Sequence, residues 1–328
     1  MTDNGRFAQF RFRNGGALVL LSVMACASAP QAALQSQGTP EAVLASQDSH
    51  GFKPINLHAE LSRTEAKNGT VVIANFTLPE ALRSKVREEA MSVEFEGIET
   101  PFFAVNSPGE PPGRYQAIVG IPYDRAPGPA RLRILVRGEE LLSTEAALEV
   151  IDGGYPQEVL HVKPKHVTPP DSAMPRIDRE VKEIVAIYRT ITRKKYWSGP
   201  LRLPIASDIT SPYGSKRVYN GELKSYHGGI DLKAAIKTPI RAAAAGRVAL
   251  AKNLYYTGNT VMLDHGYGIY SLYAHMSSLR VKRGQVVPVG KIVGLSGMTG
   301  RVTGPHLHWQ IVINRVKVDP VDLMKVLQ

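Results

Sequence analysis

A set of histidine motifs in the last third of the chain constrains its fold most, because these side chains share a role only if the fold brings them together. The motifs are His227-Gly228-Gly229-Ile230-Asp231, Tyr273-Ala274-His275 and Pro305-His306-Leu307-His308. Imidazole nitrogens and carboxylate oxygens are ligands that zinc takes from proteins. The sequence therefore predicts a fold in which these three segments converge on one point.

The His306-Leu307-His308 motif has the spacing of a β-strand. Residues two apart on a strand face the same side and lie about 6–7 Å apart. Both imidazoles are therefore expected to enter one cleft, while Trp309 points away and packs. Only one of the two histidines need bind a metal, and the other can stand beside it and contact a bound water or substrate.

The diglycine between His227 and Asp231 predicts a sharp bend. A straight strand would separate the two residues by about 13 Å, whereas each bond to a zinc ion is about 2 Å long. Consecutive glycines disfavour a helix and allow a tight turn or bulge. With His308, these residues make a His₂Asp ligand set, for which zinc is the leading metal and water the fourth ligand.

This ligand set predicts a hydrolase. A zinc ion lowers the pKa of its water toward neutrality, and that water can attack a carbonyl. His275 and His306 are then expected to move protons and to donate hydrogen bonds to the developing oxyanion. We expect His265 to be a turn residue, and we assign no role to the remaining histidines, which are His50, His58, His161 and His166. Candidates for lining the cleft are Tyr213, Tyr219, Tyr226 and Tyr255.

The first 29 residues read as a secretory signal peptide. Three arginines precede an apolar run at residues 16–27, and small residues follow it. The run is shorter than the roughly 20 residues of a membrane span. The segment Val23-Met24-Ala25-Cys26 also resembles a lipoprotein box, so lipidation at Cys26 and plain cleavage near Ala29 or Ala33 are both open. Either way the mature protein is expected outside the cytoplasm.

The composition limits the partners and the type of metal site. Cys26 is the single cysteine, which excludes an internal disulfide and a cysteine-based zinc cluster. The net charge of +11 favours an anionic partner such as a cell-wall polymer. No dense block of Lys and Arg with interleaved aromatics is present, so we expect no nucleic acid partner. Contact with a membrane is expected only through a lipid anchor at Cys26.

Short apolar runs separated by Gly/Pro turns predict a mostly β protein. A flexible tether is expected at residues 30–52, and a small immunoglobulin-like β-sandwich at 53–152 that acts as a spacer or binding module. Five prolines in residues 153–175 predict an extended linker, and apolar spacing predicts an amphipathic helix over Ile177–Ile191 that docks on a neighbouring domain. The predicted strands of the sandwich are 70–78, 91–96, 115–121, 132–136 and 146–151.

The last third is rich in strands and glycine turns and predicts a compact antiparallel sheet or barrel. Its predicted strands are 248–252, 260–265, 270–275, 291–295 and 306–314. The predicted division of the chain is a signal peptide at 1–29, a tether at 30–52, a sandwich at 53–152, a linker with its helix at 153–200 and a catalytic domain at 201–328.

Residues Ile209 to Met324 resemble the M23 (LytM/lysostaphin-type) zinc endopeptidases, whose catalytic domain is an antiparallel sheet of the barrel-sandwich type. The resemblance rests on Ser211-Pro212-Tyr213-Gly214, on the three histidine motifs and on the turn region from Val286 to Thr299, all in family order. It implies one zinc ion per catalytic domain, held by His227, Asp231 and His308, with His275 and His306 as catalytic residues. It also implies hydrolysis of peptide bonds in peptidoglycan stem peptides or cross-links.

Two other hypotheses remain open. A non-catalytic relative could bind the cell wall and activate a separate amidase, although such relatives typically lack ligands that this chain retains. A carrier role is suggested by the likeness of Val286 to Gly297 to the turn of lipoyl-type domains, but it leaves the histidines unexplained. A separate hypothesis is that the enzyme is latent because residues 153–197 cover its cleft.

Overall fold

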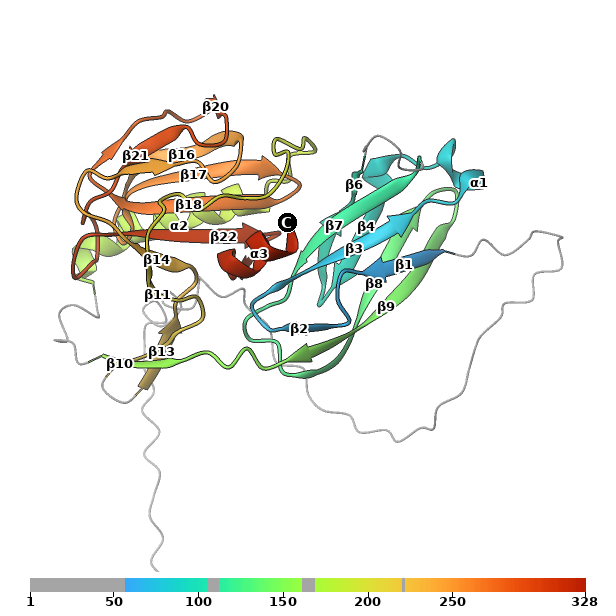
Figure 1. Ribbon diagram of the computed structural model, residues 1–328, viewed down its shortest axis with the longest axis horizontal. Coiled ribbons are helices and arrows are strands. Elements are labelled where there is room, and N and C mark those ends of the chain that lie inside the picture. The colour runs from blue at the N-terminus through green and yellow to red at the C-terminus, as the bar shows by residue number, and fades with distance from the viewer. Residues whose placement is uncertain (1–56, 106–111, 161–168, 220–221) are drawn as a thin grey trace, which may run out of the picture. The chain divides into compact units, whose positions relative to one another are not determined.

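The computed structural model describes residues 57–105, 112–160, 169–219 and 222–328 (Figure 1). The predicted signal peptide, lipidation site at Cys26 and tether lie outside these ranges. Among the described residues, no helix combines the length and apolarity needed to cross a bilayer.

Two sheets with a shared core make up the first region, and all but one of their strand pairs are antiparallel. One has the strand order β1-β3-β7-β6, and the other has the order β2-β9-β8-β4-β5, in which β2 pairs in parallel with β9. Their strands are β1 (His58–Leu61), β2 (Glu65–Lys67), β3 (Val71–Thr77), β4 (Met91–Phe95), β5 (Ile98–Pro101), β6 (Phe103–Ala104), β7 (Arg114–Gly120), β8 (Gly128–Arg137) and β9 (Leu141–Ile151), with a short helix α1 (Glu80–Arg83) after β3.

The alternation of residue types on β8 shows why these sheets form. Leu132 and Ile134 are fully buried, whereas Arg131 and Arg133 between and beside them are exposed. A strand places successive side chains on opposite faces, so this pattern buries one face and leaves the other in water. The buried face joins a single cluster with apolar residues of β3, β4, β7 and β9. All five strands predicted in this region are therefore present.

The linker contains a strand and a helix. β10 (Gln157–Leu160) pairs in parallel with β12 (Lys216–Tyr219), which forms a hairpin with β13 (Glu222–Tyr226). The predicted helix is present as α2 (Met174–Arg189). It starts three residues earlier than predicted because Pro175 lies in its first turn, where the missing N–H has no intrahelical partner to lose. It ends earlier as well, since Thr190 is already extended.

An eight-stranded sheet dominates the last region, with the order β11-β14-β22-β18-β17-β16-β20 and β23 on the side of β22. A second, three-stranded sheet has the order β15-β21-β19. The strands are β11 (Ile209–Ser211), β14 (Ile230–Lys233), β15 (Pro239–Arg241), β16 (Gly246–Leu254), β17 (Gly258–Gly266), β18 (Ile269–Met276), β19 (Ser278–Leu279), β20 (Val286–Val287), β21 (Ile292–Leu295), β22 (His306–Ile313) and β23 (Val316–Val318), and helix α3 (Pro320–Val326) follows.

Strand β22 separates two environments. Its odd-numbered residues, from Leu307 to Ile313, are completely buried in the larger core. Val312, on the opposite face, packs in a second cluster with Tyr270 and Leu272 of β18 and Tyr188 of α2. His306 and His308 have the same parity as Val312, so α2 and the histidine motif share one face of the sheet.

Side-chain contacts join the first region to the rest of the chain, and all of these residues lie in one compact unit. Arg63 donates two hydrogen bonds of 3.1 Å to the Asp322 carboxylate in α3. The Tyr267 hydroxyl donates to Glu88 at 2.5 Å, and Phe103 packs edge-on against Trp197. The first region is therefore attached by side-chain contacts as well as by the linker.

Candidate metal centre

Three strands or strand ends bring the predicted ligands together. His227 follows β13, Asp231 lies on β14, and His308 lies on β22. Asp231 and His308 are directly opposite each other in the antiparallel register of β14 and β22, so both side chains project from the same face. The strand pairing itself therefore places two of the three ligands.

The bend at Gly228 and Gly229 supplies the third ligand. His227 and the two glycines lie between strands, and β14 begins at Ile230. A Cβ atom added to Gly229 would lie 2.4 Å from the carbonyl oxygen of Trp309. Only a glycine allows the chain to pass this close to β22 while it turns, as the diglycine predicted.

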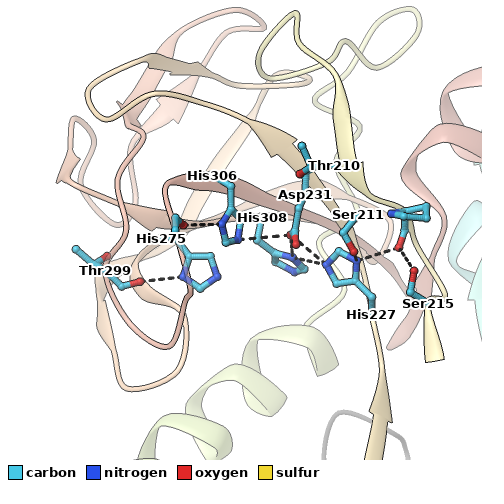
Figure 2. Close-up of polar contacts among 11 residues, drawn as sticks. Thr210, Ser211, Ser215, His227, Asp231, His275, Thr299, His306 and His308 are labelled. Atoms are coloured by element: carbon cyan, nitrogen blue, oxygen red, sulfur yellow. Dashed lines mark hydrogen bonds and ion pairs between the residues drawn. The ribbon is translucent and has the colours of Figure 1, made fainter. Parts of the chain in front are cut away.

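The three donor atoms form a compact triangle (Figure 2). His227 Nε2 lies 3.1 Å from Asp231 Oδ1 and 3.0 Å from His308 Nδ1, and His308 Nδ1 lies 2.9 Å from Asp231 Oδ1. Ligands at about 2.0 Å from a tetrahedral zinc ion are about 3.3 Å apart. The group fits a single ion of this kind. Two imidazoles and one carboxylate are also the donor types that catalytic zinc sites use.

Hydrogen bonds fix which nitrogen of His227 faces the ion. Its Nδ1 lies 2.9 Å from the carbonyl oxygen of Pro212 and 3.2 Å from Ser211 Oγ. A carbonyl oxygen only accepts, so Nδ1 carries the proton and Nε2 keeps its lone pair for a metal. An outer partner of this type orients the imidazole and makes it a better ligand.

Asp231 is held as a carboxylate. Burial alone would raise the pKa of Asp231, but its close polar contacts with the imidazoles of His227 and His308 outweigh that effect and hold the pKa well below its usual range. A metal ligand must be deprotonated, so this shift favours binding at neutral pH.

His275 and His306 form a second pair beside the triangle. Their ring centroids are 4.9 Å apart, and His306 Nε2 lies 3.7 Å from Asp231 Oδ1. The Nδ1 atoms of His275 and His306 donate to the carbonyl oxygens of Thr299 and Gly304, each at 2.9 Å. Both Nε2 atoms are thereby left with lone pairs when the rings are neutral.

The pKa of His275 is lowered to about 3, first by burial and then by the nearby His308 and His306, against a hydrogen bond to Thr299 that raises it. The residue is only 8% exposed. At neutral pH it is therefore uncharged and keeps its Nε2 lone pair, and the same burial makes it a weak base.

The structure thus brings together all five predicted site residues, and Trp309 is buried as expected. The interpretation of His265 as a turn residue is wrong: it lies in β17 and is 1% exposed. The turn comes after it because Gly266 and Gly268 have positive φ angles of 92° and 77°. His58 is exposed on β1, and His50, His161 and His166 lie outside the described residues.

The tyrosines proposed to line the cleft behave differently. Tyr213 is 2% exposed, and its hydroxyl donates to the Lys317 carbonyl. Tyr226 stacks on Tyr123 of the first region with centroids 3.8 Å apart. Both are packing residues. Sequence reasoning missed the carbonyls of Pro212, Thr299 and Gly304, because every residue has a carbonyl and side-chain types give no signal for it.

Comparison with known proteins agrees with this geometry. Residues 225–320 match peptidase family M23. Peptidoglycan DD-endopeptidase ShyA of Vibrio cholerae is 43% identical over 127 residues, which cover 38% of this chain and 29% of the relative. DD-carboxypeptidase/endopeptidase Mpg of Neisseria meningitidis is 39% identical over 115 residues, which cover 35% of this chain and 26% of the relative.

A crystal structure from Pseudomonas aeruginosa assigned to peptidase M23 resembles a larger part of the chain. It is 28% identical with a TM-score of 0.59, and the match covers 80% of this chain and 95% of that one. By contrast, the chain spans less than a third of the length of the two curated relatives.

Proposed function

We propose that the chain is a zinc-dependent endopeptidase that hydrolyses peptide bonds in peptidoglycan stem peptides or cross-links, and the match of residues 225–320 to peptidase family M23 supports this. The observation that carries the proposal is the triangle of His227 Nε2, Asp231 Oδ1 and His308 Nδ1, with sides of 2.9–3.1 Å. The substrate is supported by two relatives named for DD-endopeptidase activity, one of them on peptidoglycan.

Each of the five residues has a distinct role in this proposal. A bound zinc ion would polarise the scissile carbonyl and lower the pKa of a water molecule. His275 accepts a proton at Nε2, because its Nδ1–H is engaged by Thr299 and burial keeps the ring neutral. His306, whose Nε2 lies near Asp231, is placed to act once Nε2 carries a proton: it can then donate a hydrogen bond to the reacting carbonyl or pass the proton to the leaving amine.

Two alanine variants separate metal binding from proton handling. His308→Ala removes a donor atom and is expected to lose both the metal and the activity. His306→Ala leaves the triangle whole and is expected to keep the metal, while turnover falls by about 100-fold or more, the usual worth of a proton-handling group. Metal content by mass spectrometry and muropeptide release from cross-linked peptidoglycan measure the two effects.

Two results would contradict this role assignment. Wild-type protein that holds less than half an equivalent of divalent metal would remove the basis for the proposal. Muropeptide release that occurs only after a separate amidase is added would instead favour a non-catalytic activator. Mass spectrometry of the products also identifies the bond cleaved.

We further propose that the protein works outside the cytoplasm, in the periplasm or cell envelope. Support comes from the arginine-rich start and apolar run of residues 1–29 and from the peptidoglycan named for ShyA. An intact mass that matches a chain starting at Cys26 with added acyl groups would indicate a lipid anchor. An intact mass that matches a chain starting after Ala29 would indicate plain cleavage. A protein that keeps Met1 would contradict both.

The region at 53–152 is proposed to be an immunoglobulin-like accessory module, ahead of a linker at 153–200 and a catalytic domain at 201–328. Immunoglobulin domains place strands A, B, E and D in one sheet and C, F and G in the other. In chain order, the sheet β1-β3-β7-β6 fits A-B-E-D, and β9-β8-β4 fits G-F-C. The strand order supports the immunoglobulin interpretation.

A further inference from the structure

His275 has a backbone conformation that L-residues seldom adopt. Its φ angle is 60°, in the left-handed region, and its side chain is only 8% exposed. Non-glycine residues stay in this region only when their surroundings hold them there, and such residues gather at functional sites. The contacts that hold His275 are therefore informative about the site.

Thr299 contacts His275 through both ring and backbone. The ring Nδ1 donates to the Thr299 carbonyl at 2.9 Å, and the Thr299 N–H points to the His275 carbonyl at 3.5 Å (Figure 2). The His275 N–H donates to the Thr257 carbonyl at 2.9 Å. The Thr299 backbone thus fixes the ring orientation and leaves Nε2 as the only free nitrogen.

The Thr299 hydroxyl in turn fixes the position of its own backbone. Oγ1 donates to the Met276 carbonyl at 2.8 Å and accepts from the Asn259 N–H at 2.9 Å. The Asn259 amide also donates to the Met276 carbonyl, at 3.0 Å. One hydroxyl therefore ties the loop at Thr299 to β17 and to the residue after His275 on β18.

Two glycines make room for this hydroxyl. A Cβ atom on Gly258 would lie 2.2 Å from Thr299 Oγ1, and a Cβ atom on Gly300 would lie 2.4 Å from the Gly258 nitrogen. Both have positive φ angles, 61° and 80°. Gly297, two residues before Thr299, forms an isolated bridge with His306. The same short loop therefore reaches both members of the histidine pair.

We infer that Thr299 is the positioning residue for His275, and that the Asn259 side chain supports it by holding the Met276 carbonyl that the Thr299 hydroxyl also binds. Thr299 acts through the ring and does not itself touch the substrate. It keeps the Nδ1–H tautomer and directs the Nε2 lone pair toward the reacting groups. This inference rests on the proposed function, in which His275 accepts a proton.

A pair of variants at Thr299 tests the inference in the full mature protein. Thr299→Val keeps the shape but removes the hydroxyl, and Thr299→Ser keeps the hydroxyl. We expect Thr299→Val to lower kcat by about 10- to 30-fold, because a displaced catalytic group loses its alignment, while KM and zinc content change less than about twofold. Thr299→Ser is expected to keep at least half of the wild-type kcat. Equal loss in both variants would show that packing alone is at stake and would overturn the inference.

A spectroscopic measurement tests the same inference without activity. In protein labelled with ¹⁵N-histidine, the His275 signals, assigned by their loss in His275→Ala, should report Nδ1–H and an unprotonated Nε2. Thr299→Val should shift the ring toward a mixture of tautomers. An unchanged tautomer in that variant would overturn the inference even if kcat falls. An inactive wild type would contradict the proposed function, and the tautomer result would still decide the role of Thr299.

Asn259→Ala provides a second test if Thr299→Val does not fold. It removes the hydrogen bond that the side-chain amide donates to the Met276 carbonyl, but it leaves the backbone N–H that donates to the Thr299 hydroxyl. The expected effect is a smaller change in the same direction, about threefold in kcat with unchanged zinc content, as expected for partial misalignment. A wild-type tautomer and kcat in this variant would contradict the supporting role of Asn259.

Discussion

The two β regions of this molecule differ in what they bury. Among the described residues, the first region buries three polar side chains, those of Thr70, Ser92 and Thr100. The sheet region after residue 200 buries many more: Ser215, His227, Thr260, Asp264, His265, Ser271, His275, Ser296, Gln310 and Asn314. Burying a polar group is costly unless it is hydrogen-bonded. The second region therefore has a free-energy cost of burying polar side chains that a purely structural sheet avoids.

This difference separates scaffold from site more clearly than secondary structure does. Both regions have short strands with glycine turns, and both have continuous apolar clusters. Among the described residues, buried imidazoles occur in the second region alone, where the backbone carbonyls of Pro212, Thr299 and Ala245 hold them. Substitutions in the second region should therefore change chemistry, whereas those in the first should change stability alone.

Removal of the Asp231 carboxylate is expected to have the largest effect. In Asp231→Ala, two histidines remain as metal ligands and the charge that balances the ion is gone. Loss of an outer-shell partner alone typically costs 10- to 100-fold in metal affinity, so we expect a loss of at least about 100-fold and no detectable muropeptide release. Competition with a chelator measures the affinity. Retention of wild-type affinity would place the metal elsewhere.

The second-largest effect is expected from a methyl group added at the bend before β14. Gly229→Ala would push a Cβ atom to 2.4 Å from the Trp309 carbonyl and 3.0 Å from His308 Cε1. Backbone cannot move aside as a flexible side chain can, so β14 must shift from β22. We expect metal affinity and turnover to fall by about 10- to 100-fold, as for disturbed outer-shell groups.

The neighbouring glycine supplies the matched control. In Gly228→Ala the new Cβ atom would meet Lys317 Cδ at 2.7 Å, in the middle of a long side chain that can change rotamer. Activity and metal content should stay within about threefold of wild type, since only this flexible contact changes. If both alanine variants behave alike, the close approach at Gly229 does not determine the geometry of the metal centre.

A cavity in the first region should affect stability alone. Ile134 is fully buried in the apolar cluster of β3, β4, β7, β8 and β9. Ile134→Ala is expected to reduce the free energy of unfolding by about 2–5 kcal/mol, measured by denaturant titration. Turnover per folded molecule and metal content should match wild type. A parallel loss of metal would show that the two regions are coupled through the contacts between them.

Much of the site follows from the sequence because its ligands are side chains in short motifs. The two-residue spacing of His306 and His308 predicts their common face, and the diglycine predicts the bend before Asp231. The register that puts Asp231 opposite His308 is long-range, and no local pattern contains it. For the same reason, the prolines predicted only that the linker is extended, and they did not predict the parallel pairing of its strand β10 with β12.

The misinterpretation of His265 has a physical reason. Asp264 and Gly266 beside it suggest a turn, since both residue types are common there. In the structure, Asp264 does accept from the Gly266 N–H, as a turn residue would, but it also accepts from Thr192, and Asp264 and Gly266 still pair with β18. Thr192 lies 72 residues away, so the acceptance of Asp264 into a strand depends on tertiary contacts.

His265 also gives the smallest expected effect, a dependence of stability on pH. Burial lowers its pKa, against a hydrogen bond to the Ala245 carbonyl and the charge of Asp264, which raise it. Its ring also contacts Ser271 Oγ at 2.7 Å and is 1% exposed. Above the unfolded-state pKa of about 6.5, both states are neutral and His265 has no effect. Below that pH, the unfolded chain binds a proton at His265 that the folded protein does not bind, so stability falls.

The slope of this fall should approach about 1.4 kcal/mol per pH unit for one proton. His265→Gln should remove the part of this slope that His265 contributes. The stability difference between wild type and variant should therefore shrink as the pH falls from 6.5. Differencing is needed because His275, with its own lowered pKa, contributes in both proteins. Parallel curves for wild type and His265→Gln would mean that the buried ring of β17 is protonated in the folded protein as easily as in the unfolded chain.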